Sequence, residues 1–109
     1  MASAGEKPWE VDTASRVYGL EIILLKRTYV LPWTQFLYAE GTSEEVQAVF
    51  STHDVVVTGS GLSSLLADFA SQQIAILRQP ARTEMFADGA TAPRIFEVQV
   101  RRLDAADSD

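Results

Sequence analysis

The chain contains no cysteine and a single histidine in 109 residues. The absence of cysteine excludes disulfide scaffolds, cysteine-ligated zinc sites and thiol nucleophiles. Long hydrophobic runs are also missing, because the longest one, Ile22 to Leu25, is far shorter than a membrane span. The first residues include Glu6 and Lys7 instead of the apolar stretch of an export signal. We therefore expect a protein of the reducing cytoplasm with no membrane partner.

An excess of positive charge is missing as well, since the formal net charge is −6. Residues 1–14 carry three acidic groups against one lysine, and residues 104–109 carry three aspartates. That leaves nine acidic and eight basic residues in the stretch 15–103. A nearly neutral domain lacks the basic surface that nucleic-acid binding requires, so we expect no nucleic-acid partner. We interpret 15–103 as one folded domain between two disordered acidic tails, 1–14 and 104–109.

What the chain does contain is a series of short strand-like segments. Alternating or continuous apolar residues predict strands in six segments, 20–31, 34–40, 45–51, 55–59, 74–80 and 94–103. Alternation places Phe36 and Tyr38 on one face of the second segment, and it turns Phe96, Val98 and Val100 inward in the last one. The fold class that follows is α+β, a mostly antiparallel sheet of about six strands arranged as a meander or a partly closed barrel.

One amphipathic helix is predicted over about 61–73, before the fifth strand. Its apolar stripe recurs at helical spacing through Leu62, Leu65, Leu66, Phe69 and Ala70. Ser60 precedes this stripe and is the expected N-cap. A single helix cannot cover both faces of such a sheet. The other face must therefore curl on itself or meet another copy of the chain.

The segment "VVVTGSGLSS" joins the fourth strand to the helix through two glycines. It is one residue away from the glycine fingerprint of dinucleotide-binding sites. The acidic residue that would hold the ribose is missing, and only one strand-helix-strand unit is available. We favour a simple turn, since such a turn needs glycine for a positive φ. The alternative is a small-ligand site that seats an anion or phosphate on Gly59, Ser60 and Gly61, with help from Arg78 or Arg82.

No combination of residues in the sequence points to catalysis. His53 stands beside Asp54, but sequence neighbours rarely orient each other as catalytic partners do. We interpret His53 as a solvated turn residue, and an enzymatic role would depend on it alone. Glu44 and Glu45 are adjacent and point to opposite faces of a strand, so they form no shared metal site. We expect no metal and no cofactor, and we favour a non-enzymatic role while leaving an enzymatic role through His53 open.

The stretch "YVLPWTQFLY" is rich in aromatic residues. Trp33, Phe36 and Tyr38 are expected either in the core or at an interface, where aromatic side chains commonly dominate binding. Met85 and Phe86 in a polar segment are similarly either a plug over the core or an exposed anchor. The excess of apolar strand residues favours a small non-enzymatic interaction or scaffolding module that associates with itself, with a dimer as the expected form and a protein partner as a further possibility. The small-ligand module described above is the alternative.

Overall fold

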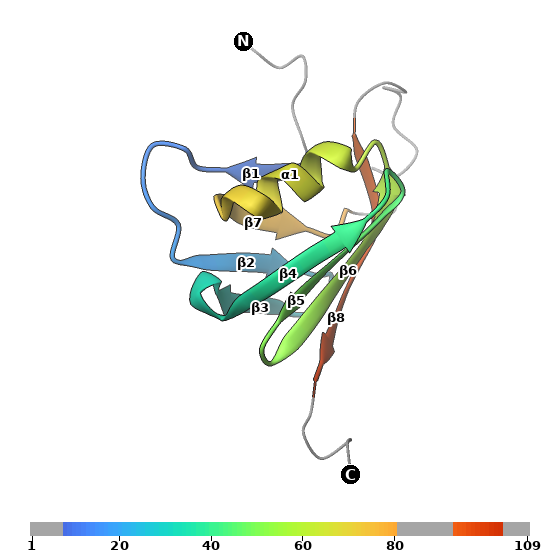
Figure 1. Ribbon diagram of the computed structural model, residues 1–109. Helices are drawn as coiled ribbons and strands as arrows, with labels where there is room; N and C mark the ends of the chain where they lie inside the picture. The colour runs from blue at the N-terminus through green and yellow to red at the C-terminus, as the bar shows by residue number, and fades with distance from the viewer. Residues whose placement is uncertain (1–7, 81–92, 104–109) are drawn as a thin grey trace.

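The protein forms two four-stranded sheets and one helix in a computed structural model that describes residues 8–80 and 93–103 (Figure 1). The first sheet has the order β1-β7-β2-β3, formed by Trp9–Val11, Ile74–Arg78, Gly19–Ile23 and Thr28–Pro32. The second has the order β4-β5-β6-β8, formed by Phe36–Gly41, Glu45–Phe50, His53–Ser60 and Arg94–Arg102. Helix α1 spans Ser63–Ser71, and a 3-10 turn, Trp33–Gln35, leads from β3 into β4.

The α+β class and the predominance of antiparallel pairing are confirmed, since only β2 and β7 pair in parallel among the described strands. The single sheet of about six strands is wrong: the described residues form eight strands in two sheets. One reason is that the segment 20–31 is a hairpin, closed by a hydrogen bond from the Leu24 N–H to the Arg27 carbonyl, 2.8 Å. Its turn contains neither glycine nor proline, so the sequence gives no turn signal there.

Strand β1 is the second reason for the higher count, and it lies inside the stretch 1–14 that the sequence suggests is a tail. Trp9 is almost fully buried, and its indole N–H donates to Asp68 Oδ2 at 2.8 Å. Three residues are too few to show an alternating pattern, which is why this strand has no periodic signature.

The two sheets face each other across one hydrophobic core. In Figure 1 the strands of the first sheet run horizontally, those of the second cross them diagonally, and α1 lies over β4 beside β7. The core combines buried residues of both sheets and the helix: Trp9, Leu20, Ile22, Leu31, Trp33, Val46, Ala48, Phe50, Val55, Val57, Leu62, Leu65, Phe69, Ile74, Leu77, Ile95 and Val98. The apolar strand surface is therefore largely covered within one chain, and the helix supplies Leu65 and Phe69 to the same core.

The helix is shorter than predicted and begins differently. Ser60 is the last residue of β6, and Leu62 occupies the N-cap position without a side-chain cap. The Ser60 cap is thus wrong. The Leu62 N–H donates to the Ser43 carbonyl at 2.8 Å, which attaches the start of the helix to the β4–β5 turn.

Two β-bulges change which residues face the core. In β4, Phe36 lies opposite Phe50 and Tyr38 opposite Val49, so Leu37 is an extra residue and Tyr38 does not share the face of Phe36. In β8, the register shift leaves Phe96 as the extra residue. The predicted inward orientation of Phe96 is wrong because the bulge turns it toward solvent and buries Ile95 instead.

The side chain of Gln79 connects the two sheets. Its Nε2 donates to the Phe96 carbonyl at 3.2 Å, and its Oε1 accepts the Val98 N–H at 2.5 Å. The Gln79 backbone N–H donates to the Ile23 carbonyl in the first sheet at 2.8 Å. One residue thereby joins β2 to the edge of β8 as a neighbouring strand would.

Candidate functional site

The two glycines of the strand-turn-helix segment have different structural causes. A Cβ at Gly59 would lie 1.9 Å from the Arg94 carbonyl oxygen, because β8 bulges against β6 at this point. Gly61 has a φ of 65°, the left-handed region that glycine tolerates best. Backbone geometry therefore accounts for both glycines without a ligand.

The parallel strand-helix-strand unit of a dinucleotide site does not form. Strand β6 belongs to the second sheet and β7 to the first, so α1 crosses between sheets (Figure 1). Arg78, predicted to assist this site, lies 3.6 Å from Glu10 in an exposed ion pair. Arg82 lies outside the described residues.

The predicted interface residues divide into core and surface. Trp33 is buried, its ring centroid lies 5.2 Å from that of Phe36, and its indole N–H donates to the Ile74 carbonyl at 3.2 Å. Phe36 packs against the same core. Tyr38 remains 52% exposed and adjoins Leu37, 61% exposed. Met85 and Phe86 lie outside the described residues.

Strand β4 is an edge of the second sheet, and no other strand of residues 8–80 and 93–103 pairs with its outer side. It ends the strand order, and it carries the exposed pair Leu37 and Tyr38. The other edge strands are blunted: β3 contains Pro32, β1 has only three residues, and β8 is engaged by Gln79. The sequence predicts Tyr38 as a candidate interface residue but gives no reason to select Leu37, because the exposure of Leu37 follows from the bulge.

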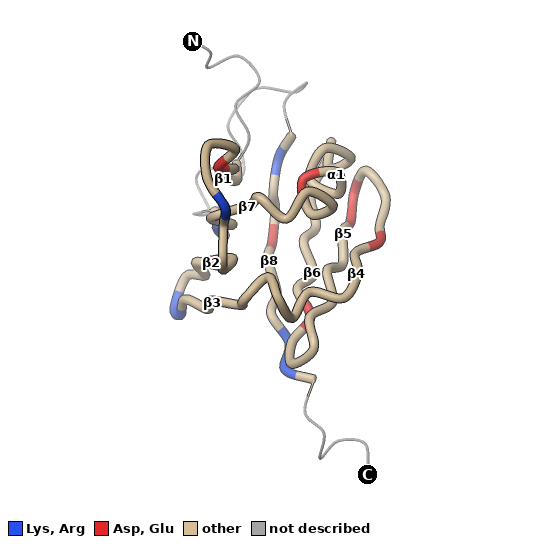
Figure 2. Tube along the Cα trace, turned by 60° about the vertical axis from the view of Figure 1, so that its left-hand side comes forward, with Lys and Arg blue, Asp and Glu red and all other residues tan. Residues whose placement is uncertain are grey.

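Acidic residues gather where β4 turns into β5. Glu40, Glu44 and Glu45 belong to this hairpin, which contains no lysine or arginine. A shallow hollow of about 330 Å³ lies here, lined by Glu40, Gly41, Thr42, Glu45 and Gln47. In Figure 2 acidic segments mark this end of the hairpin, and the basic segments lie elsewhere along the chain. The exposed apolar pair is therefore next to a locally negative surface.

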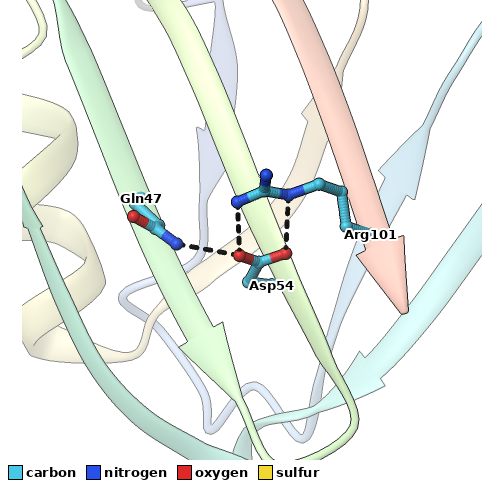
Figure 3. Close-up of polar contacts among 3 residues, drawn as sticks. All are labelled: Gln47, Asp54 and Arg101. Carbon is cyan, nitrogen blue, oxygen red and sulfur yellow. Dashed lines mark hydrogen bonds and ion pairs between the residues drawn. The ribbon is translucent and has the colours of Figure 1, made fainter. Parts of the chain in front are cut away.

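Asp54 forms the most buried polar contact of the second sheet (Figure 3). Only 4% of Asp54 is exposed, and its carboxylate accepts hydrogen bonds from Gln47 Nε2 at 2.8 Å and from Arg101 Nη2 at 2.7 Å. Burial raises the pKa of Asp54, but the Arg101 and Gln47 hydrogen bonds and the Arg101 charge outweigh it, so the pKa lies below its ordinary value. This carboxylate is ionised and fully engaged, as a structural ion pair requires.

His53 is placed by contacts rather than by a catalytic partner. Its Nδ1 lies 2.8 Å from Thr52 Oγ1, and its ring meets that of Tyr29 edge-on with centroids 5.7 Å apart. Asp54 bonds to Gln47 and Arg101 and takes no part in orienting the imidazole. Within residues 8–80 and 93–103, no cluster of three metal-ligating side chains occurs. No helix in this part of the chain is long and apolar enough to cross a membrane.

A larger cleft lies at the C-terminal end of α1. It has a volume of about 600 Å³ and is lined by Thr13, Ala14, Ser15, Arg16, Val17, Tyr18, Trp33, Thr34, Ser71, Gln72 and Gln73. The sequence offered no motif for it, because its walls come from three separated segments and contain no recognisable pattern.

Comparisons with protein-family models, with curated proteins and with solved structures give no match to this chain. The geometry of the edge strand and of the cleft is therefore the basis for assigning a function.

Proposed function

We propose that this protein is a small non-enzymatic interaction module that assembles with a second copy of itself through strand β4. The observation that carries the proposal is that β4 has one side unpaired among the described strands, with Leu37 and Tyr38 exposed beside it. An open strand edge is a template for pairing with another strand, and exposed apolar residues add the burial that stabilises such a pair. A two-fold dimer is the commonest symmetric assembly.

Backbone geometry supports a particular register for this pairing. The Thr42 N–H donates to the Glu45 carbonyl at 2.7 Å, and bonded pairs alternate along an antiparallel ladder. Ala39 and Gly41 therefore direct their N–H and carbonyl groups away from β5. A two-fold axis at Ala39 would bond the two Ala39 residues to each other and place Tyr38 opposite Glu40 of the second copy. The two second sheets would then form one continuous sheet.

A non-enzymatic role is supported by how the polar residues are used. The residues nearest to a catalytic pair in the sequence, His53 and Asp54, bond to different neighbours. Both are engaged in contacts within the fold rather than in contact with each other.

The test is sedimentation velocity on the double variant Leu37→Glu/Tyr38→Glu, which places two carboxylates on the proposed interface. Val30→Glu is the matched control, because Val30 is 65% exposed on β3 of the other sheet. We expect wild type and the control to sediment as dimers and the double variant to sediment as a folded monomer. A monomeric wild type, or equal association of all three proteins, would contradict the proposal.

A second candidate occupant of the same edge is an extended basic segment of another protein. It is favoured by Glu40, Glu44 and Glu45, whose charge would attract lysine or arginine side chains. The salt dependence of association distinguishes self-association from binding of a basic segment. Screening weakens attraction to a basic strand, but it relieves repulsion between the Glu40 residues of two copies. Self-association that strengthens between about 0.05 and 0.5 M NaCl supports the dimer, and association that weakens over this range supports the basic partner.

A further inference from the structure

We propose that the cleft at the C-terminal end of α1 binds an anionic carbohydrate, a small polyol that carries one carboxylate or phosphate group. This site is separate from the β4 edge, since none of its lining residues belongs to β4. Its volume of about 600 Å³ falls within the usual range of small-molecule sites.

One wall of the cleft is formed by Tyr18 and Trp33, which continue the hydrogen-bonded pairing of β2 and β3 beyond the ends of these strands. The Trp33 N–H donates to the Tyr18 carbonyl at 2.9 Å, which continues the β2–β3 pairing. Tyr18 lies two residues before Leu20 and four before Ile22, which are both buried. By strand alternation it is therefore on the core side of the sheet. Because it stands past the end of the sheet, it is 74% exposed, and it is one of the residues that line the cleft.

The opposite wall of the cleft is formed by the residues at the end of α1, and hydrogen bonds connect it to the segment 12–15. The Asp12 N–H donates to the Gln73 carbonyl at 3.0 Å, which links this segment to the residues that follow the helix. The Asp12 carboxylate accepts the Ala14 N–H at 2.9 Å and the Ser15 N–H at 3.3 Å. These bonds lower the pKa of Asp12, so the carboxylate is ionised when it orders the segment. The cleft is thus preformed, which reduces the entropy lost on binding.

Arg16 gives the cleft a cationic group that can pair with an anion. Among the described residues that line the cleft, Arg16 is the one with a formal charge, and its Cζ lies 5.8 Å from the centre of the Tyr18 ring. A guanidinium held over an aromatic ring keeps its outer N–H groups free for a carboxylate or phosphate.

The neutral side chains and the helix end select hydroxyl groups. Thr13, Thr34, Gln72 and Gln73 line the cleft, and no hydrogen bond to another described residue occupies their side chains. The end of α1, where Gln72 adopts a φ of 58°, carries the negative end of the helix dipole. The carbonyls of Asp68, Phe69 and Gln73 already accept hydrogen bonds within the protein, so this end of the helix repels a bare anion and offers hydroxyls only its remaining acceptor capacity. A ligand that has both an anionic group and several hydroxyls satisfies Arg16 and the helix end together.

The experiment is isothermal titration of the full chain with four probes: glucuronate, glucose 6-phosphate, glucose and inorganic phosphate. We expect glucuronate or glucose 6-phosphate to bind with 1:1 stoichiometry, and the better of the two identifies the anionic group. Glucose and inorganic phosphate should each bind at least about tenfold more weakly, the loss expected when one charge-assisted contact or the hydroxyl contacts are missing.

The variant Arg16→Gln should weaken binding of the better probe by about tenfold or more. Arg102→Gln is its matched control, an exposed arginine at the end of β8 that does not line the cleft. The inference is overturned if neither anionic sugar binds at about 10 mM, if phosphate binds as well as the sugars, or if Arg16→Gln has no effect. The double variant of Leu37 and Tyr38 should retain binding, so failure of the dimer and failure of this site are distinguishable.

Discussion

Arg101 and Asp54 form a two-point ion pair across neighbouring strands. Arg101 Nε lies 3.1 Å from Asp54 Oδ1, and Arg101 Nη2 lies 2.7 Å from Oδ2. The two residues are directly opposite in the β6–β8 ladder, so strand register brings them together. The carboxylate is nearly inaccessible to water, whereas the arginine side chain is 58% exposed. The two partners therefore differ in burial. Loss of the ion pair is unfavourable mainly for Asp54, whose buried carboxylate would remain without a charged partner.

The first prediction concerns this difference in burial. Arg101→Gln leaves the Asp54 carboxylate without its ion-pair partner, so we expect the free energy of unfolding to fall below that of wild type, by an amount that solvent screening of the exposed arginine limits. Urea denaturation measures the change. Arg102→Gln, on the same strand, is the control and should change stability by less than about 0.5 kcal/mol. Equal effects of the two variants would show that the ion pair contributes nothing specific.

The second prediction concerns pH. The pKa of Asp54 is lowered from 3.8, so its ionised form stabilises the fold. This contribution is complete above pH 3.8, the unfolded value, and is lost as the pH falls through the lower folded-state pKa. The stability difference between wild type and Asp54→Asn should therefore be constant near neutral pH and shrink below pH 3.8. Urea titrations across this range test it, and a difference that grows in acid would mean that the folded-state pKa is raised.

The third prediction separates the two glycines. Gly59→Ala forces a methyl group onto the Arg94 carbonyl, so we expect a loss of about 2–4 kcal/mol and a displaced β8. Gly61→Ala adds only the strain of a positive φ, about 1 kcal/mol, and Gly61→Asn should cost less than Gly61→Ala. Thermal unfolding without ligand measures all three. If Gly59→Ala is as stable as wild type, the close approach of β8 is not a constraint.

The fourth prediction concerns Gln79. Gln79→Met keeps a side chain of similar length but removes both hydrogen bonds to β8, and we expect a loss of about 1–2 kcal/mol. Hydrogen exchange gives a local readout, since the Val98 amide should exchange faster while the β5–β6 amides keep their protection. Unchanged protection at Val98 would contradict the role assigned to Gln79.

The sequence predicted well those elements whose pattern is local. The inward face of β5 follows from the spacing of Val46, Ala48 and Phe50, and all three are buried. The β-branched segment 55–59 is likewise found in a strand, β6. Leu62, Leu65 and Phe69 likewise match the helical stripe.

The rest depends on contacts between distant segments. The two bulges arise where neighbouring strands meet, and they alter the exposure of Tyr38 and Phe96 without any mark in the surrounding residues. The division into two sheets is decided by the partners of β7, which pairs with β1 and β2 rather than with β6. The cleft escaped prediction for the same reason, because Tyr18, Thr34 and Gln72 come together only when the first sheet and the helix are assembled.

The link from Gln79 to β8 has a consequence for chain continuity. Strand β8 is fixed by its long ladder with β6 and by the amide of Gln79, and neither attachment requires the peptide bonds between residues 80 and 93. A protein expressed as two fragments divided in that interval should reassemble, with the shorter fragment captured as a strand by the longer one. The fold is thus suited to serve as a split reporter, in which recovery of the complete protein signals that two fused partners have met.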